Sequence, residues 1–118
     1  MNGTGYRTGL IKDTNRTNWQ NSGPRPIAWS AWYPADGNAT QPLPPDPLFD
    51  AGEIRPGAEI ASGGPYPVVL LSHGTGGTAE SLGWLARALV ARGHVVLAPQ
   101  HHGNTGIEPY CPEGFLCW

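Results

Sequence analysis

The sequence has little charge, and its few charged residues form no cluster. Charged residues make up 14% of the 118 positions, and the formal net charge is -2. A nucleic-acid-binding domain usually carries a basic patch or stripe, so no nucleic-acid partner is indicated. The chain also lacks an apolar run of about 18 residues, the length that a membrane-spanning helix needs.

The first residues, MNGTGYRTG, lack the charged and apolar regions of a secretory signal peptide, so a cytoplasmic location is the default expectation. Only two cysteines occur, Cys111 and Cys117, and their spacing fits neither a CxxC redox pair nor a zinc site. A local disulfide, which would indicate an exported protein, and two free thiols fit the sequence about equally well.

The sequence is rich in glycine, with 17 residues, and in proline, with 13 residues, and it contains five tryptophans. The glycines and prolines indicate many turns. The tryptophans and apolar runs need burial, so the chain is expected to fold. The length fits one domain or part of one, and we interpret residues 1–118 as a single partial domain. Residues 34–66, where prolines and glycines recur, are expected to form a long irregular loop with a short turn near Pro47–Ala51.

Two strands are predicted before that loop. Tyr6–Asp13 alternates in part, and PIAWSAWYP alternates clearly, with Trp29 and Tyr33 on one face and Trp32 on the other. Together they resemble an antiparallel opening pair. The tryptophans could line an acyl pocket, but at strand and helix spacing they more often pack in the core, and Trp84 is treated as packing too.

Residues 67–98 predict a strand, a helix and a second strand. PVVLLSH and HVVLAP are apolar without alternation, which is typical of strands buried on both faces of a parallel sheet. Between them, Leu82, Leu85, Ala86 and Leu89 follow helical spacing in a helix of about 14 residues, with Glu80 off that face and Gly93 as its stop. The predicted fold class is therefore α/β.

The turn after the first buried strand is rich in glycine. LLSHGTGG, starting at Leu70, places three glycines within four positions between a strand and a helix. One chemistry that needs such a turn is phosphate binding, and Gly74, Gly76 and Ala79 fit the dinucleotide fingerprint. That fingerprint expects an acidic residue at the end of the next strand, and here the strand ends in Ala98-Pro99-Gln100, so a dinucleotide-binding module is the weaker alternative.

The other chemistry is acyl transfer, in which a carbonyl oxygen becomes negative. Fixed backbone N–H groups aimed at that oxygen are worth about 3–4 kcal/mol each. A His-Gly-x-Gly turn after a central strand leaves N–H groups that point outward, so the turn fits an oxyanion hole.

Four motifs together resemble a known family: WYPA from Trp32, PVVLLSHGTGG from Pro67, LARALVARGHVVLAP from Leu85, and HHGNT from His101. They are similar to the α/β-hydrolase family of predicted dienelactone hydrolases, which is related to platelet-activating-factor acetylhydrolase-like esterases. Family members usually have Asp-His where this chain has Gln100-His101. The resemblance implies the N-terminal part of an α/β-hydrolase sheet.

The resemblance also implies a function for the complete protein, a serine-type ester or lactone hydrolase with a small-molecule substrate and no cofactor. The backbone N–H of Thr75 would be one oxyanion donor, because an N–H from this loop serves there in α/β-hydrolases. Four residues would shape the loop, namely His73, Gly74, Gly76 and Gly77.

The catalytic triad is not found. None of the five serines lies in G-x-S-x-G, so no nucleophile, acid or base is assigned, and the chain by itself is expected to be inactive. Ser72 and His73 are adjacent at a strand end, so their side chains point to opposite faces. A metal site of His73, His101 and His102 is conceivable, but structural or solvated histidines fit better because no carboxylate or cysteine stands at ligand spacing, and no metal is assigned.

A different class of function remains open, a non-catalytic half-domain that binds a partner through an open sheet edge. In the resembled family the PVVLLSH strand lies between the HVVLAP strand and the nucleophile strand. Without that second neighbour its apolar edge is unprotected, which predicts self-association or low stability of this chain.

Overall fold

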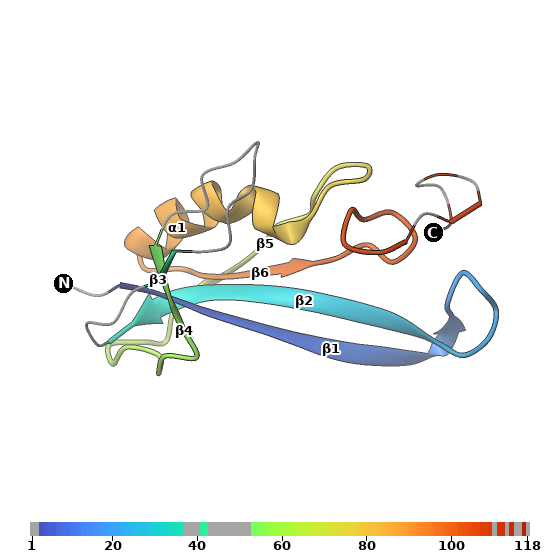
Figure 1. Ribbon diagram of the computed structural model, residues 1–118. Helices are drawn as coiled ribbons and strands as arrows, with labels where there is room; N and C mark the ends of the chain where they lie inside the picture. Colours follow the sequence, from blue (N-terminus) through green and yellow to red (C-terminus); the bar gives the residue numbers. More distant parts are fainter. Residues whose placement is uncertain are drawn as a thin grey trace.

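The computed structural model describes residues 3–36, 41–42, 53–109, 111–112, 114 and 117. Its centre is one mixed sheet with strand order β3-β4-β1-β2-β6-β5 (Figure 1). β1 (Gly3–Thr17) and β2 (Pro24–Ala35) form a long antiparallel hairpin. The predicted opening pair is therefore confirmed, although both strands extend beyond the predicted ranges.

The hairpin closes through a turn that its own asparagines stabilise. The amide of Asn18 donates to the carbonyl of Gly23 at 2.9 Å, and the Asn18 side chain accepts from the amide of Ser22 at 2.9 Å. Asn21 has φ of 57°, a backbone conformation that asparagine tolerates better than most residues.

The strand–helix–strand unit is also present, but its first strand is not buried as expected, since Val68 and Leu70 are both more than half exposed. β5 (Val68–Leu70) pairs in parallel with β6 (Val95–Pro99), and β6 pairs antiparallel with β2. The helical segment between them is a 3₁₀ turn, η1 (Ala79–Leu82), followed by α1 (Gly83–Ala91). Gly93, at φ of 84°, ends the helix as predicted.

The face that the helix buries matches the predicted stripe only in part, since Ala86 is buried whereas Leu82, Leu85 and Leu89 are partly exposed. Its buried positions are small residues and one valine: Ala79, Gly83, Ala86 and Val90. Small side chains let the helix approach the sheet closely, and they pack against Trp32, Val96 and Ala98. Trp84, treated as packing from the sequence, is 54% exposed because it lies off this face.

The segment expected to be an irregular loop contains two short strands. β3 (Gln41–Pro42) pairs antiparallel with β4 (Glu53–Pro56), and β4 pairs in parallel with β1. The turn predicted near Pro47–Ala51 lies outside the described residues. Ile54 of β4 is buried in the main core, which explains why this short strand forms despite the surrounding prolines.

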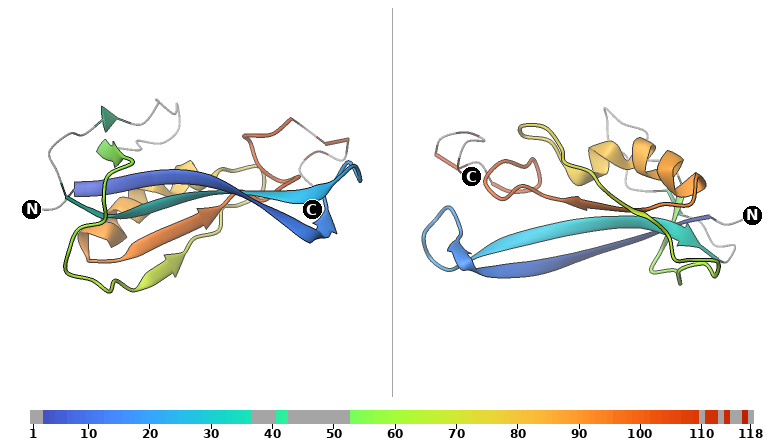
Figure 2. Two further views of the ribbon diagram at one scale, coloured as in Figure 1. Left: turned by 90° about the horizontal axis from the view of Figure 1, so that it is seen from below. Right: turned by 180° about the vertical axis from the view of Figure 1, so that it is seen from behind.

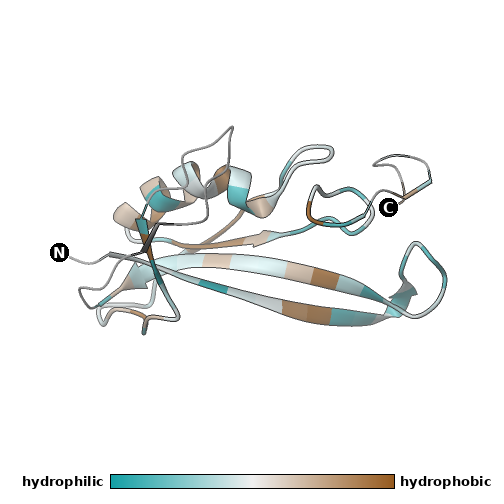
Figure 3. Ribbon diagram, in the orientation of Figure 1, coloured by the Kyte–Doolittle hydropathy of each residue, from teal (hydrophilic) through white to brown (hydrophobic). Residues whose placement is uncertain are grey.

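α1 covers one face of the sheet, and no described helix covers the other (Figure 2). On that open face Ile11 of β1 pairs with Ile27 of β2, while the neighbouring pair Leu10 and Ala28 points to the opposite face. Figure 3 shows apolar stretches side by side on the two strands. Leu10 and Ile11 are both more than half exposed. Within the described residues no helix is long and apolar enough to cross a membrane.

Candidate oxyanion loop and its supports

The candidate site lies at the carboxyl ends of β5 and β6, where two loops run side by side (Figure 1). The first loop, residues 72–78, contains all five residues expected from the sequence. The second loop, residues 100–109, follows β6 and contacts the first through side chains. We call them the glycine loop and the supporting loop.

The glycine loop contains a tight turn, since the amide of Gly77 donates to the carbonyl of Gly74 at 3.0 Å. Gly76 has φ of 68°, a conformation that strongly favours glycine. Its amide donates to Oδ1 of Asn104 in the supporting loop at 2.9 Å. Among the described residues, by contrast, no acceptor pairs with the N–H groups of Gly74 and Thr75, and both residues are exposed.

The supporting loop holds the glycine loop through buried polar side chains. Oε1 of Gln100 accepts from the amide of Ala79 at 3.0 Å, at the start of η1. The hydroxyl of Thr105 lies 3.0 Å from the carbonyl of Gly77 and 3.1 Å from Oε1 of Gln100. Gln100, Asn104 and Thr105 are each at most 5% exposed, and a buried polar group that lost its partner would destabilise the fold.

Nothing in the sequence pattern predicted a role for these three supporting residues. The stretch after β6 has no periodicity, and the only available signal was HHGNT in the family resemblance. Gln100 stands where the family usually has aspartate, and here its side chain joins the two loops and the helix start.

Glu80 is a second support, and its position contradicts the sequence expectation. Oε1 of Glu80 accepts from the hydroxyls of Tyr6 at 2.8 Å and Ser30 at 2.5 Å, and Oε2 accepts from Nε2 of Gln100 at 2.7 Å. The side chain was expected off the leucine face of the helix, which gave no reason to bury it. It turns inward because three donors from β1, β2 and the supporting loop converge on it.

Burial and these hydrogen bonds shift the pKa values of Glu80 and Tyr6. Burial works to raise the pKa of Glu80, but donors from Ser30, Tyr6 and Gln100 outweigh it and hold the pKa below its ordinary value. Burial, followed by smaller effects that include the Glu80 carboxylate, raises the pKa of Tyr6 to about 12. Glu80 is therefore an ionised anchor for the start of η1 at neutral pH.

His73 is buried and both of its ring nitrogens are engaged. Nε2 accepts from the backbone N–H of His101 at 3.0 Å, so Nδ1 carries the proton and donates to the carbonyl of Gly74 at 2.7 Å. The ring also packs against that of His101, with 4.4 Å between centroids. His73 thus links the start of the glycine loop to the backbone of the supporting loop.

His102 is also structural. Nε2 accepts from the backbone N–H of Trp19 at 3.2 Å, and Nδ1 lies 2.8 Å from Oε1 of Glu108. Because both nitrogens are occupied, neither His73 nor His102 has a free nitrogen for a metal. Among the described residues no group of three His, Cys, Asp or Glu side chains could hold a metal ion.

Ser72 does not contact His73, as expected, but it does contact another histidine. Its hydroxyl lies 2.6 Å from Nε2 of His101. Burial, followed by the neighbouring His73, lowers the pKa of His101. A serine–histidine contact is the first half of an activated nucleophile, but no carboxylate among the described residues bonds to His101 to orient it.

The supporting loop continues into a disulfide between Cys111 and Cys117, with the sulfurs 2.13 Å apart. The sequence left disulfide and free thiols open, and the structure contains the bond. The loop passes close to the bridge, since the carbonyl of Cys117 stands 2.1 Å from the position that a Cβ on Gly103 would take. Gly103, at φ of 81°, is therefore restricted to glycine by both space and conformation.

Comparison with solved structures identifies the class of fold. A ferulic acid esterase from Streptomyces cinnamoneus is similar, with a TM-score of 0.75 at 28% sequence identity; the match covers 95% of this chain and 36% of that chain. No family model matches the chain, and no curated protein matches its sequence. The chain thus has the fold of the N-terminal part of an α/β-hydrolase sheet, and it spans 36% of the length of that esterase.

Proposed function

We propose that this chain is the N-terminal segment of a serine-type ester or lactone hydrolase, in which the N–H of Thr75 is one oxyanion donor. The observation that carries the proposal is the contrast between neighbouring amides. The N–H groups of Gly76 and Gly77 are engaged within the protein, while those of Gly74 and Thr75 have no acceptor among the described residues, and Thr75 is the one that the family resemblance assigns.

The supports around the loop agree with this role. An oxyanion hole works because its donors are fixed before the reaction begins, and the glycine loop is fixed by Asn104, Thr105 and His73. Similarity to an esterase favours ester hydrolysis over other chemistries of this fold. Dienelactone hydrolase or platelet-activating-factor acetylhydrolase-like specificity is the finer form of the proposal, and it rests on the sequence motifs.

The nucleophile, acid and base would come from residues outside this sequence. The strand β5 has one described neighbour, β6, and the proposal places the nucleophile strand on its other side. A coding sequence that continues past Trp118 into an apolar strand and G-x-S-x-G would support it. A native stop there would favour the alternative, a half-domain that binds a partner through the β5 edge.

The test compares two substitutions in the full-length protein, with p-nitrophenyl acetate as substrate. Thr75→Ala keeps the backbone N–H, so kcat/KM should stay within a few-fold of the parent. Gly76→Val cannot easily adopt a φ of 68°, so kcat should fall by about a hundredfold, the cost of losing one oxyanion donor. Thermal unfolding of both variants shows whether the fold survives. The reverse ranking would remove the assignment and indicate chemistry by the Thr75 hydroxyl.

A further inference from the structure

The disulfide between Cys111 and Cys117, called the bridge below, has no role in the function proposed above, but it packs against the supporting loop. The backbone carbonyl of Cys117 lies so close to Gly103 that a Cβ at this glycine would overlap it. Sγ of Cys111 lies 3.9 Å from the carbonyl oxygen of the same glycine. Both cysteines therefore contact Gly103 of the supporting loop.

The residues that follow Gly103 hold the glycine loop. The side chain of Asn104 accepts from the amide of Gly76 at 2.9 Å. The carbonyl of Gly77 accepts from the hydroxyl of Thr105 at 3.0 Å and from the amide of the next residue at 2.9 Å. A shift of Gly103 would reach these three bonds, because each residue has only two soft dihedral angles with which to absorb it.

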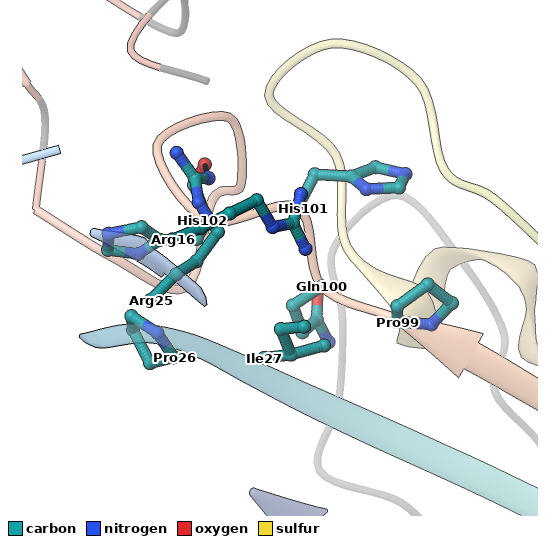
Figure 4. A pocket seen from close by; sticks show the side chains of 8 residues that line it. All are labelled: Arg16, Arg25, Pro26, Ile27, Pro99, Gln100, His101 and His102. Carbon is teal, nitrogen blue, oxygen red and sulfur yellow. Dashed lines mark hydrogen bonds between the residues drawn. The ribbon is translucent and has the colours of Figure 1, made fainter. Parts of the chain in front are cut away.

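The start of the supporting loop is anchored without the bridge. The amide of Gln100 donates to a carbonyl of β2 at 2.8 Å, and both the ring and the carbonyl of His102 bond to the hairpin. Figure 4 shows Gln100, His101 and His102 lining one cleft together with side chains of the hairpin. Gly103, the next residue, is held by a 2.9 Å bond from its amide to Glu108 and by the bridge. The bridge therefore acts on the second part of the loop rather than on the sheet.

The bridge closes a short stretch of chain and is open to a reductant. The two cysteines are six residues apart, and closing a short loop constrains the unfolded chain less than closing a long one. Opening the bridge should therefore disturb the supporting loop more than the fold as a whole. Cys111 is buried, whereas Cys117 is partly exposed, so a thiolate can reach the sulfur of Cys117.

Reduction by a dithiol takes two exchange steps. A thiolate of the dithiol attacks Sγ of Cys117, the S–S bond of the bridge breaks, and Cys111 leaves as a thiolate that takes up a proton. The second thiolate of the reductant then attacks the reductant's other sulfur in the mixed disulfide, and Cys117 leaves in the same way. Two electrons and two protons pass to the cysteines, and the dithiol becomes a cyclic disulfide.

We propose that the bridge is a redox-sensitive positioning device for the glycine loop. In the oxidised form it keeps Gly103 in place, and with it the three bonds from residues 104–106 to the glycine loop. Reduction by a dithiol frees Gly103 and loosens these bonds while the sheet stays folded. The effect on catalysis rests on the proposed function: the N–H of Thr75 stabilises an oxyanion only while it is held in position, so the reduced enzyme is slower.

The first experiment measures amide hydrogen exchange by NMR on the 118-residue chain, at one pH, with and without dithiothreitol. The amide of Gly76 should exchange at least about tenfold faster after reduction, since local opening governs exchange. The amide of Val95, which donates to the carbonyl of Pro67 at 2.9 Å at the far end of β5 and β6, should not change. Equal acceleration at both amides would show that the bridge stabilises the whole fold, and no acceleration at Gly76 would show that it does not hold the loop. Either result would overturn the proposal.

Variants test the path from the bridge to the glycine loop. The double variant Cys111→Ser with Cys117→Ser should exchange at Gly76 as fast as the reduced parent and should not respond to dithiothreitol. In Asn104→Ala the bond to Gly76 is already absent, so reduction should add little at that amide. Circular dichroism checks that each variant is folded. The same acceleration by dithiothreitol in Asn104→Ala as in the parent would refute the path through Asn104.

A second experiment separates this inference from the proposed function. The full-length protein is reduced with dithiothreitol, freed of the reductant and assayed with p-nitrophenyl acetate. We expect kcat to fall about tenfold, less than when a donor is lost outright, and KM to stay within about twofold, as for an interaction made in the transition state. Oxidised glutathione should restore kcat, and the double serine variant should not respond to either reagent.

The outcomes of the two experiments are distinct. An unchanged kcat after reduction refutes the positioning device and leaves the esterase proposal intact. Faster exchange at Gly76 on reduction, together with no hydrolysis by either form of the full-length protein, refutes the esterase proposal and leaves the redox-sensitive loop in place.

Discussion

The amide of Gly76 donates to the side chain of Asn104, 28 residues further along the chain, at 2.9 Å. This bond joins the glycine loop after β5 to the supporting loop after β6. It also occupies an N–H that would otherwise compete with that of Thr75 for an incoming oxyanion. Asn104 is 3% exposed, so the bond is shielded from water.

Asn104→Ala should therefore lower the free energy of unfolding by about 1–3 kcal/mol, because it leaves the Gly76 amide without its acceptor. Urea unfolding measures the loss, and hydrogen exchange at the Gly76 amide should accelerate. Thr14→Ala, at an exposed position of β1, is the control and should change little. Unchanged exchange at Gly76 in Asn104→Ala would show that the bond does not hold the loop.

The isolated chain should not react stoichiometrically with a fluorophosphonate probe. Ser72 contacts His101 at 2.6 Å, but activation of a serine also requires that the base be oriented by a third group. Mass spectrometry of the treated protein gives the fraction labelled. Stoichiometric labelling that disappears in Ser72→Ala would place a working nucleophile at Ser72 and contradict this expectation.

Glu80 should make stability depend on acid pH. Its pKa is held below the ordinary 4.5 in the folded chain, so its contribution is present above that value and is lost as pH falls through the lower, folded pKa. Glu80→Gln should be less stable than the parent at pH 7, and the difference should shrink as the pH falls below 4.5.

Urea unfolding of both proteins across this pH range measures the effect. Glu53→Gln, at an exposed position of β4, is a control that removes one carboxylate without touching the Tyr6–Ser30–Gln100 cluster. A difference between the parent and Glu80→Gln that does not vary with pH would mean that the carboxylate is not stabilised by its three donors.

The edge of β5 should make this chain self-associate. β5 has one described neighbour, and Val68 and Leu70 are 58% and 73% exposed. Exposed apolar edges recruit other strands, and a lysine on the edge opposes this. Leu70→Lys should shift size-exclusion and light-scattering profiles toward monomer, whereas Ile107→Lys, on the supporting loop, should not. A sharp monomer peak with cooperative unfolding for the parent would contradict the prediction.

The amino-acid sequence determined the elements and the place of the glycine loop. Strand alternation in PIAWSAWYP, the apolar runs of β5 and β6, and Gly93 as helix stop all act between neighbours in the chain, so they can be recognised locally. The resemblance of four motifs then indicated the hydrolase sheet, and the strand order and the similarity to an esterase agree with it.

Only the tertiary structure decided how that loop is held and what surrounds it. Glu80 meets Tyr6 and Ser30 across 74 and 50 residues, and Gly76 meets Asn104 across 28. Arg25 of the hairpin meets the carbonyl of His102 across 77 residues. Such pairings depend on which strands become neighbours in the sheet, so no local pattern reveals them. The helical segment packs its alanines against the sheet and turns Glu80 inward because close packing and three converging donors outweighed the spacing of the leucines.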